Sequence, residues 1–134
     1  MKKLFFIILS VLCVVLSACG HSTEEKNEGG NAMYLEISQQ EAKELMDSQK
    51  DFVILDVREQ EEFDQGHIGG AILIPYTQIG DKAEEILPRK DQLILVYCRS
   101  GRRSKIAAQV LSDLGYTNVK EFGGIIDWPY GVEQ

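Results

Sequence analysis

The sequence predicts an α/β fold in three layers, with a central sheet of five parallel strands between helices. From residue 34 onward, apolar strand-like runs alternate with helical patterns, as in domains where helices connect parallel strands. The runs FVILDV at 52–57 and LILVYC at 93–98 are almost wholly apolar, which indicates strands buried on both faces. A length of 134 residues with 44% apolar residues fits one such domain.

The first half of the domain is predicted to hold three strands and two helices. In order, they are strand 34–37, helix 42–49, strand 52–57, a short acidic helix at 59–66 and strand 71–75. Ser38 is a predicted N-cap, and Glu41 three residues later completes a capping box. The first helix should therefore begin directly after the first strand.

The second half is predicted to continue the alternation. In order, it holds helix 81–87 closed by Pro88, strand 93–98, helix 104–116, strand 119–122 and a short terminal helix and tail at 123–134. The helix at 104–116 carries Ile106, Val110, Leu111 and Leu114 on one face, with Gly115 at its C-terminal end. That face is expected to pack on the sheet.

The N-terminus is predicted to be a secretory signal rather than part of the fold. Lys2 and Lys3 precede an apolar run, and small residues follow it. An uncleaved anchor is the alternative, but Leu4 to Ala18 is short of the roughly 20 apolar residues that span a bilayer.

The end of this segment, LSAC at 16–19, resembles a bacterial lipobox. The resemblance implies that residues 1–18 are a lipoprotein signal peptide and that Cys19 is lipidated at the start of the mature chain. An ordinary cleavage site with an incidental cysteine is the alternative. A multiply acylated cysteine would hold the chain on the extracytoplasmic face of a membrane in the bacterial envelope. Residues 19–33 are polar and predicted to form a flexible tether before the domain at 34–134.

Net charge and cysteine usage narrow the functional classes. Loss of Lys2 and Lys3 leaves twelve basic and twenty-one acidic side chains, a net charge of −9, which argues against nucleic acid as a partner. After removal of the signal and lipidation of Cys19, Cys98 has no partner for a disulfide within the chain. A single thiol in an outward-facing compartment suggests chemistry at Cys98.

The stretch YCRSGRRS surrounds this cysteine with three of the five arginines in the chain. Cys98 ends a buried strand just before a helix, where open α/β sheets bind ligands and where loop N–H groups and the helix dipole attract anions. We expect the dipole and the arginines to lower the cysteine pKa, and Gly101 to let the loop curl. The alternatives are a cysteine that is merely buried and arginines on a solvated surface.

Three segments together resemble the single-domain rhodanese family of sulfurtransferases. They are LDVREQEEFDQGHIGGAILIP, YCRSGRRS and GGIIDWP, and the resemblance spans about residues 34–133. It implies a parallel sheet flanked by helices, a persulfide formed on Cys98 as the catalytic residue, and no cofactor or metal. The donor would be a small anion such as thiosulfate, and the acceptor would be cyanide or a thiol, including a thiol on a protein. The predicted substrate-binding residues are Arg99, Ser100, Gly101, Arg102, Arg103, Asp56 and Arg58.

The other family positions carry weaker expectations. Asp56 and Arg58 end a strand on the same sheet edge as Cys98, so a structural ion pair is the alternative to substrate binding. His67 is expected to stabilise a turn rather than to act as a base, and Gly69 replaces the usual proline. Trp128 is expected to pack in the core near the active-site face.

Two other functional classes remain open. Related folds include phosphatases and arsenate reductases, whose loop places an arginine six positions after the cysteine, but residue 104 is Ser. Rhodanese-like domains also serve as docking modules, and a persulfide used for sulfur carriage or redox sensing would leave the same sequence. Retention of Cys98 with a complete loop favours chemistry.

Overall fold

The computed structural model describes residues 33–134. The predicted signal peptide at 1–18, the lipidation site at Cys19 and the tether up to residue 32 lie outside the described residues. Within the described part, no helix is long and apolar enough to cross a bilayer.

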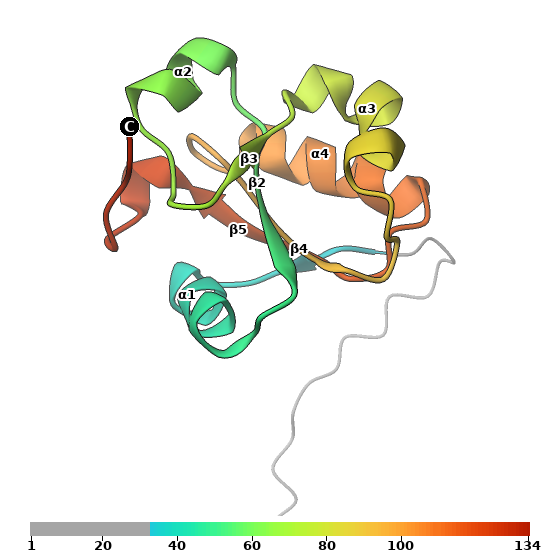
Figure 1. The fold of residues 1–134 in the computed structure, drawn as a ribbon, viewed down its shortest axis with the longest axis horizontal. Helices are drawn as coiled ribbons and strands as arrows, with labels where there is room; N and C mark the ends of the chain where they lie inside the picture. Colours follow the sequence, from blue (N-terminus) through green and yellow to red (C-terminus); the bar gives the residue numbers. More distant parts are fainter. Residues whose placement is uncertain (1–32) are drawn as a thin grey trace, which may run out of the picture.

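One sheet of five parallel strands forms the centre of the domain (Figure 1). Its strands, in spatial order, are β1 (Leu35–Glu36), β5 (Val119–Gly124), β4 (Leu93–Cys98), β2 (Phe52–Asp56) and β3 (Ile72–Leu73). In the register between β2 and β4, Asp56 lies opposite Tyr97. The carboxyl ends of β2 and β4 therefore meet at the same sheet edge.

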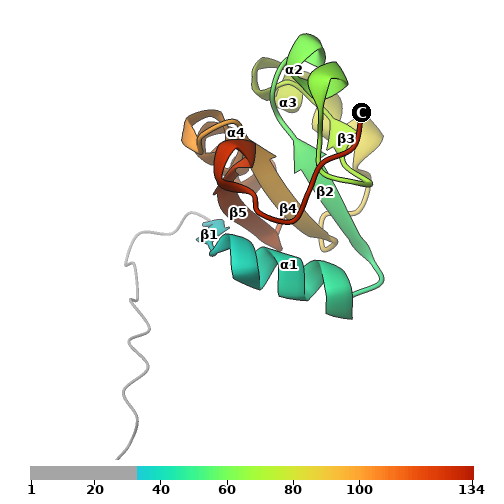
Figure 2. The ribbon, with the colours of Figure 1, turned by 90° about the vertical axis from the view of Figure 1, so that its left-hand side faces the viewer.

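Helices cover both faces of this sheet. They are α1 (Gln39–Ser48), α2 (Gln60–Gln65), α3 (Ile79–Ile86) and α4 (Arg102–Asp113), with 3-10 turns η1 (Tyr76–Gln78) and η2 (Ile125–Asp127). Helix α1 lies on one side of the sheet, and α2, α3 and α4 lie on the other (Figure 2). The predicted three-layer α/β fold is confirmed.

Strand β4 is buried on both faces because it contributes to two hydrophobic clusters. Ile94 and Val96 join the cluster beneath α3 and α4, while Leu95 and Tyr97 join the one beneath α1. All six residues of the strand are buried. The alternation of side chains across the sheet thus explains why the sequence of this strand is apolar throughout.

The predicted capping box is present, since the Ser38 hydroxyl accepts from the Glu41 N–H and the Glu41 carboxylate accepts from the Ser38 N–H. Helix α4 differs from its prediction in two ways. It begins at Arg102, two residues early. Its buried face is formed by small residues such as Ala107 and Ala108. The prediction that Ile106 faces the core was wrong, because this residue is 43% exposed.

Candidate active site

Cys98 ends β4 and lies beneath a tight loop that leads into α4. Gly101 caps the helix at a φ of 104°, a left-handed conformation that favours glycine, and this turn lets its N–H donate to the Cys98 sulfur at 3.1 Å. The Ser104 hydroxyl lies 3.4 Å from the sulfur. Cys98 itself is only 1% exposed. The loop thus places one N–H group and one hydroxyl within hydrogen-bonding distance of the sulfur.

These contacts set the acidity of the thiol. Burial raises the pKa of Cys98, but hydrogen bonds from the Ser104 side chain and from the backbone of Ser104, Gly101 and Ser100 lower it, and the net pKa lies below its usual value. The direction agrees with the prediction. The leading causes differ from those expected, because the Ser104 hydroxyl and the loop N–H groups lower the Cys98 pKa most.

The three loop arginines have different surroundings. Arg99 and Arg102 are exposed, and Arg102 lies over the Tyr76 ring with its guanidinium carbon 6.0 Å from the ring centre. Arg103 instead makes a two-pronged ion pair with Glu62 of α2, at 2.7 and 2.8 Å. This hydrogen bonding lowers the pKa of Glu62 to about 2 and raises that of Arg103. Only Arg99 and Arg102 therefore present a free charge at the loop surface.

Asp56 and Arg58 form a buried ion pair beside this loop. The Arg58 guanidinium donates to both Asp56 oxygens at 2.7 to 3.0 Å and to the Gly66 carbonyl at 2.7 Å. The Tyr97 hydroxyl donates to Asp56 at 2.7 Å, and burial together with the Asp56 charge raises the pKa of Tyr97. This geometry favours a bracing role for the pair, and contact with substrate stays a prediction.

Two cavities flank the cysteine loop. One, of about 510 Å³, is lined by Ser100, Gly101 and Arg102, with Lys105 beside them. The other, of about 340 Å³, is lined by Arg58 and Arg99 together with apolar residues of η2. Five of the predicted substrate-binding residues are thus divided between two openings, and the other two, Asp56 and Arg103, line neither.

Gly124 is a site residue that the sequence analysis missed. A Cβ atom added to it would lie 2.0 Å from the Arg99 carbonyl oxygen and 2.5 Å from the Ser100 Cα, so only glycine lets β5 approach the loop this closely. The neighbouring Ile126 N–H donates to the same Arg99 carbonyl at 3.2 Å. In the sequence, the GG doublet at 123–124 is the feature from which this contact could have been predicted.

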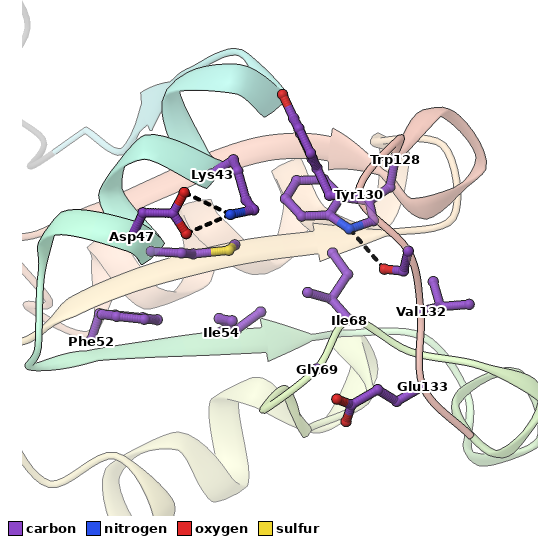
Figure 3. A pocket seen from close by; sticks show the side chains of 12 residues that line it. Lys43, Asp47, Phe52, Ile54, Ile68, Gly69, Trp128, Tyr130, Val132 and Glu133 are labelled. Carbon is purple, nitrogen blue, oxygen red and sulfur yellow. Dashed lines mark hydrogen bonds and ion pairs between the residues drawn. The ribbon is translucent and has the colours of Figure 1, made fainter.

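His67 and Trp128 lie apart from the sulfur contacts. A His67 ring nitrogen lies 3.0 Å from the Phe63 carbonyl, and its ring stacks on Phe63 at 3.9 Å, which is the arrangement of a turn-stabilising residue. Trp128 packs partly buried against Phe122 and lines a groove on the α1 side of the sheet, where its ring nitrogen donates to the Gly131 carbonyl (Figure 3). No cluster of metal-ligating side chains occurs among residues 33–134.

The family assignment follows from a comparison with protein families. The model of the rhodanese-like domain matches residues 38–128, which include the whole cysteine loop and the two strand ends beside it. The chain belongs to the rhodanese family. In this rhodanese, the match also covers the Glu62, Arg103 and Gly124 contacts described above.

The relatives of this rhodanese include two named as thiosulfate sulfurtransferases and one named as a sulfur carrier. The thiosulfate sulfurtransferase PspE of Escherichia coli K12 is 40% identical over 73 residues, which are 54% of this chain and 70% of that one. The thiosulfate sulfurtransferase GlpE of Coxiella burnetii is 35% identical over 97 residues, covering 72% and 88%. The putative sulfur carrier protein YrkF of Bacillus subtilis is 37% identical over 94 residues, but this match spans only half of that protein.

Solved structures agree with the family. A structure titled "rhodanese with anions from E. coli" has a TM-score of 0.58 at 35% identity and covers 61% of this chain and 96% of its own. The protein SSP1007 of Staphylococcus saprophyticus has a TM-score of 0.66 at 29% identity, with 75% and 99% covered. The order and direction of strands in the present chain are thus those of a known fold.

Proposed function

We propose that this rhodanese transfers a sulfane sulfur through a persulfide on Cys98. The Cys98 thiolate attacks the outer sulfur of a donor such as thiosulfate, the sulfur–sulfur bond of the donor breaks, and sulfite leaves with the electron pair. The product is Cys98–S–S⁻. A thiol acceptor in its thiolate form then attacks the outer sulfur, and Cys98 leaves as a thiolate, which restores the site.

One observation supports this proposal above the others: the Gly101 N–H donates to the sulfur from a loop that runs into the N-terminus of α4. Fixed N–H groups stabilise negative charge on sulfur before and after transfer, and they need no reorganisation during the reaction. No cofactor has a part in the proposed steps.

The exposed arginines support an anionic donor. Arg99 and Arg102 stand on either side of the loop, each at the opening of a cavity. Local positive charge attracts an anion although the predicted mature chain carries −9, because charges farther away than about 8 to 10 Å are screened by salt. A small dianion such as thiosulfate matches these openings better than a neutral donor.

Phosphate ester hydrolysis is the less suitable reaction for this loop. Position 104 holds a fully buried serine, whose hydroxyl contacts Cys98, and an arginine is absent from this position. The last arginine of the loop, Arg103, is already paired with Glu62. The sixth position after the cysteine therefore lacks the guanidinium group that would bind a tetrahedral phosphate through two hydrogen bonds.

The test is the intact mass of the purified chain after incubation with thiosulfate. We expect a gain of one sulfur atom, its loss on addition of a thiol, and no gain in Cys98→Ser. The absence of any gain with every sulfane donor offered would contradict the proposal and favour a docking role.

A sulfur carrier is the second candidate, since one relative bears that name. A carrier would load Cys98 once but turn over slowly with small thiols. Comparison of the single-turnover loading rate with steady-state sulfite release separates the two, because an enzyme sustains release and a carrier stops after one equivalent.

We further propose that the chain is lipid-anchored through Cys19 on the extracytoplasmic face of a bacterial membrane. The support is the sequence of residues 1–19 alone. Replacement of Cys19 by Ser should move the protein from the membrane fraction to the soluble fraction, and unchanged membrane attachment would contradict the proposal.

A further inference from the structure

Glu121 is a buried acid that the proposed chemistry does not use. It lies in β5 and is 2% exposed. One of its oxygens accepts hydrogen bonds from the Ser104 hydroxyl at 2.6 Å and from the Gly123 N–H at 2.8 Å. None of the ion pairs formed within residues 33–134 includes it. A buried carboxylate without an ion-pair partner is costly, so its position needs an explanation.

The Ser104 hydroxyl connects this acid to Cys98. Its oxygen lies 2.6 Å from the Glu121 carboxylate and 3.4 Å from the Cys98 sulfur. A hydroxyl carries one proton, and the short contact to an ionised carboxylate is the stronger place for it. In that arrangement the Ser104 oxygen accepts the S–H of the thiol, and the hydroxyl lowers the Cys98 pKa only when its proton turns from the carboxylate to the sulfur.

The opposite arrangement of protons satisfies the same two contacts of the Ser104 oxygen. A protonated Glu121 donates to the Ser104 oxygen, which frees the Ser104 proton to donate to a Cys98 thiolate. The two arrangements hold the same number of protons and differ only in which residue carries the charge.

We propose that Glu121 and Cys98 are coupled across the Ser104 hydroxyl, so that an ionised Glu121 opposes the ionisation of Cys98 that the loop N–H groups favour. Glu121 is thus a positioning residue that acts through Ser104. The inference rests on the role proposed for Cys98 in sulfur transfer. It assigns the loop N–H groups and Glu121 opposite effects on the same sulfur.

Persulfide formation relieves this conflict. The charge of Cys98–S–S⁻ lies on the outer sulfur rather than on Sγ, and Arg99 and Ser100 are exposed at the loop surface while Ser104 and Glu121 are buried. Because the Ser104 contact is to Sγ and the persulfide charge lies one atom farther out, Glu121 opposes charge on the bare cysteine sulfur more than on the transferred sulfur, while the loop N–H groups favour negative charge in both states. A resting thiol also resists alkylation and oxidation, because the thiolate is the reactive form.

Other charges near the pair belong to several elements. They are Lys105 and Tyr34, which interact electrostatically with Glu121; Arg102, Glu36 and Asp127, which line the same cavity; and Arg103, which interacts with Cys98. Lys105 is held by Glu36 at 3.1 Å. These groups are unchanged in the variants below, so their effect on the comparison cancels.

The test measures the acidity of Cys98 without any sulfur donor. The full chain is alkylated with iodoacetamide from about pH 5 to about pH 10, and the peptide containing Cys98 is quantified by mass spectrometry. We expect Glu121→Gln to lower the pH midpoint by about one to two units, because the change removes a nearby charge and also frees the Ser104 proton to donate to the thiolate. Glu44→Gln, an exposed and distant change of equal charge, should leave the midpoint unchanged.

A second background isolates the role of the hydroxyl. In Ser104→Ala, the shift caused by Glu121→Gln should fall to less than half, and a full shift there would overturn the part assigned to Ser104. A midpoint in Glu121→Gln that is equal to or above that of the unaltered chain would overturn the coupling.

A measurement on the unaltered chain covers the case in which Glu121→Gln does not fold. The infrared S–H stretch of Cys98, identified by its loss in Cys98→Ser, should be present at about pH 6, and its absence would overturn the inference. Failure of sulfur loading from thiosulfate would count against the proposed function alone, since neither alkylation nor the S–H band depends on it.

Discussion

Two neighbouring strand ends at one edge of the sheet carry charged residues, but they use them in opposite ways. At the end of β2, Asp56 and Arg58 neutralise each other, and Tyr97 and the Gly66 carbonyl take up further hydrogen bonds. At the end of β4, the loop after Cys98 leaves two arginines exposed to solvent. The closed network supports the site, and the open loop is where an anion can bind. Charged residues near a cysteine therefore indicate reactivity only where their charges are not already paired.

The largest expected effect on sulfur uptake comes from crowding the open loop. In Gly124→Ala, the new Cβ would meet the Arg99 carbonyl at 2.0 Å, so the backbone around Cys98 must move. We expect single-turnover sulfur uptake from thiosulfate to fall by about 100-fold, the cost of a displacement of roughly 1 Å at a reacting centre.

The matched control for this change is Gly80→Ala in α3, where a new Cβ meets nothing within 4 Å. Uptake in that variant should equal that of the unaltered chain. An unimpaired Gly124→Ala would show that the contact between β5 and the loop has no part in the reaction.

The next effect comes from opening the closed network. Asp56→Asn leaves the Arg58 charge buried and unpaired, so we expect the free energy of unfolding in urea to fall by about 3 to 5 kcal/mol. In the folded variant, sulfur uptake should fall by less than about tenfold, because the ion pair supports the loop but does not carry the transferred sulfur.

Asp47→Asn breaks an ion pair of similar length on the surface of α1 and is the control. Its unfolding free energy should change little, since exposed pairs contribute little to stability. Equal losses in the two variants would contradict the contrast between buried and exposed pairs.

The smallest effect concerns the ion pair that joins the two regions. The hydrogen bonds from Arg103 keep the pKa of Glu62 at about 2 in the folded chain, against an ordinary value of 4.5. Because the folded value is the lower one, the stabilisation is complete above about pH 4.5 and is lost as the pH falls toward 2.

Urea unfolding at either end of this range measures the contribution. Glu62→Gln should lose about 1 to 2 kcal/mol of the acid-dependent stability, a figure reduced for partial exposure of the pair. Glu44→Gln should keep the full dependence. A Glu62→Gln variant that is as acid-sensitive as the unaltered chain would mean that the pair adds no stability.

Much of the fold was predictable because its signals are local. The capping box of Ser38 and Glu41 spans four residues, and the apolar run of β4 reports its own burial on both faces. The face of α4 was predicted less well. Periodicity placed Ile106 inward, but small alanines let the helix approach the sheet, and the bulkier isoleucine lies outside. The volume available between two elements cannot be read from one of them.

The site was predictable to the same extent, because its local features could be predicted and its contacts between remote segments could not. Cys98 and the glycine that turns its loop follow from seven consecutive residues. The partner of Arg103 lies 41 positions away in α2, and the contacts of Gly124 and Glu121 come from β5. The family resemblance identified the loop, but it did not predict which of its three arginines are paired and which are exposed.

The sequence by itself determined that a cysteine ends a buried strand and precedes a glycine and a helix, because propensity, capping and hydropathy act over a few residues. Only the tertiary structure decided which charges near that cysteine are paired, buried or free. The reason is the strand order, which places β4 between β2 and β5 and so brings Asp56 to one side of the cysteine strand and Glu121 to the other. Electrostatic effects on a thiol depend on such distances, and distances between remote segments exist only in the folded chain.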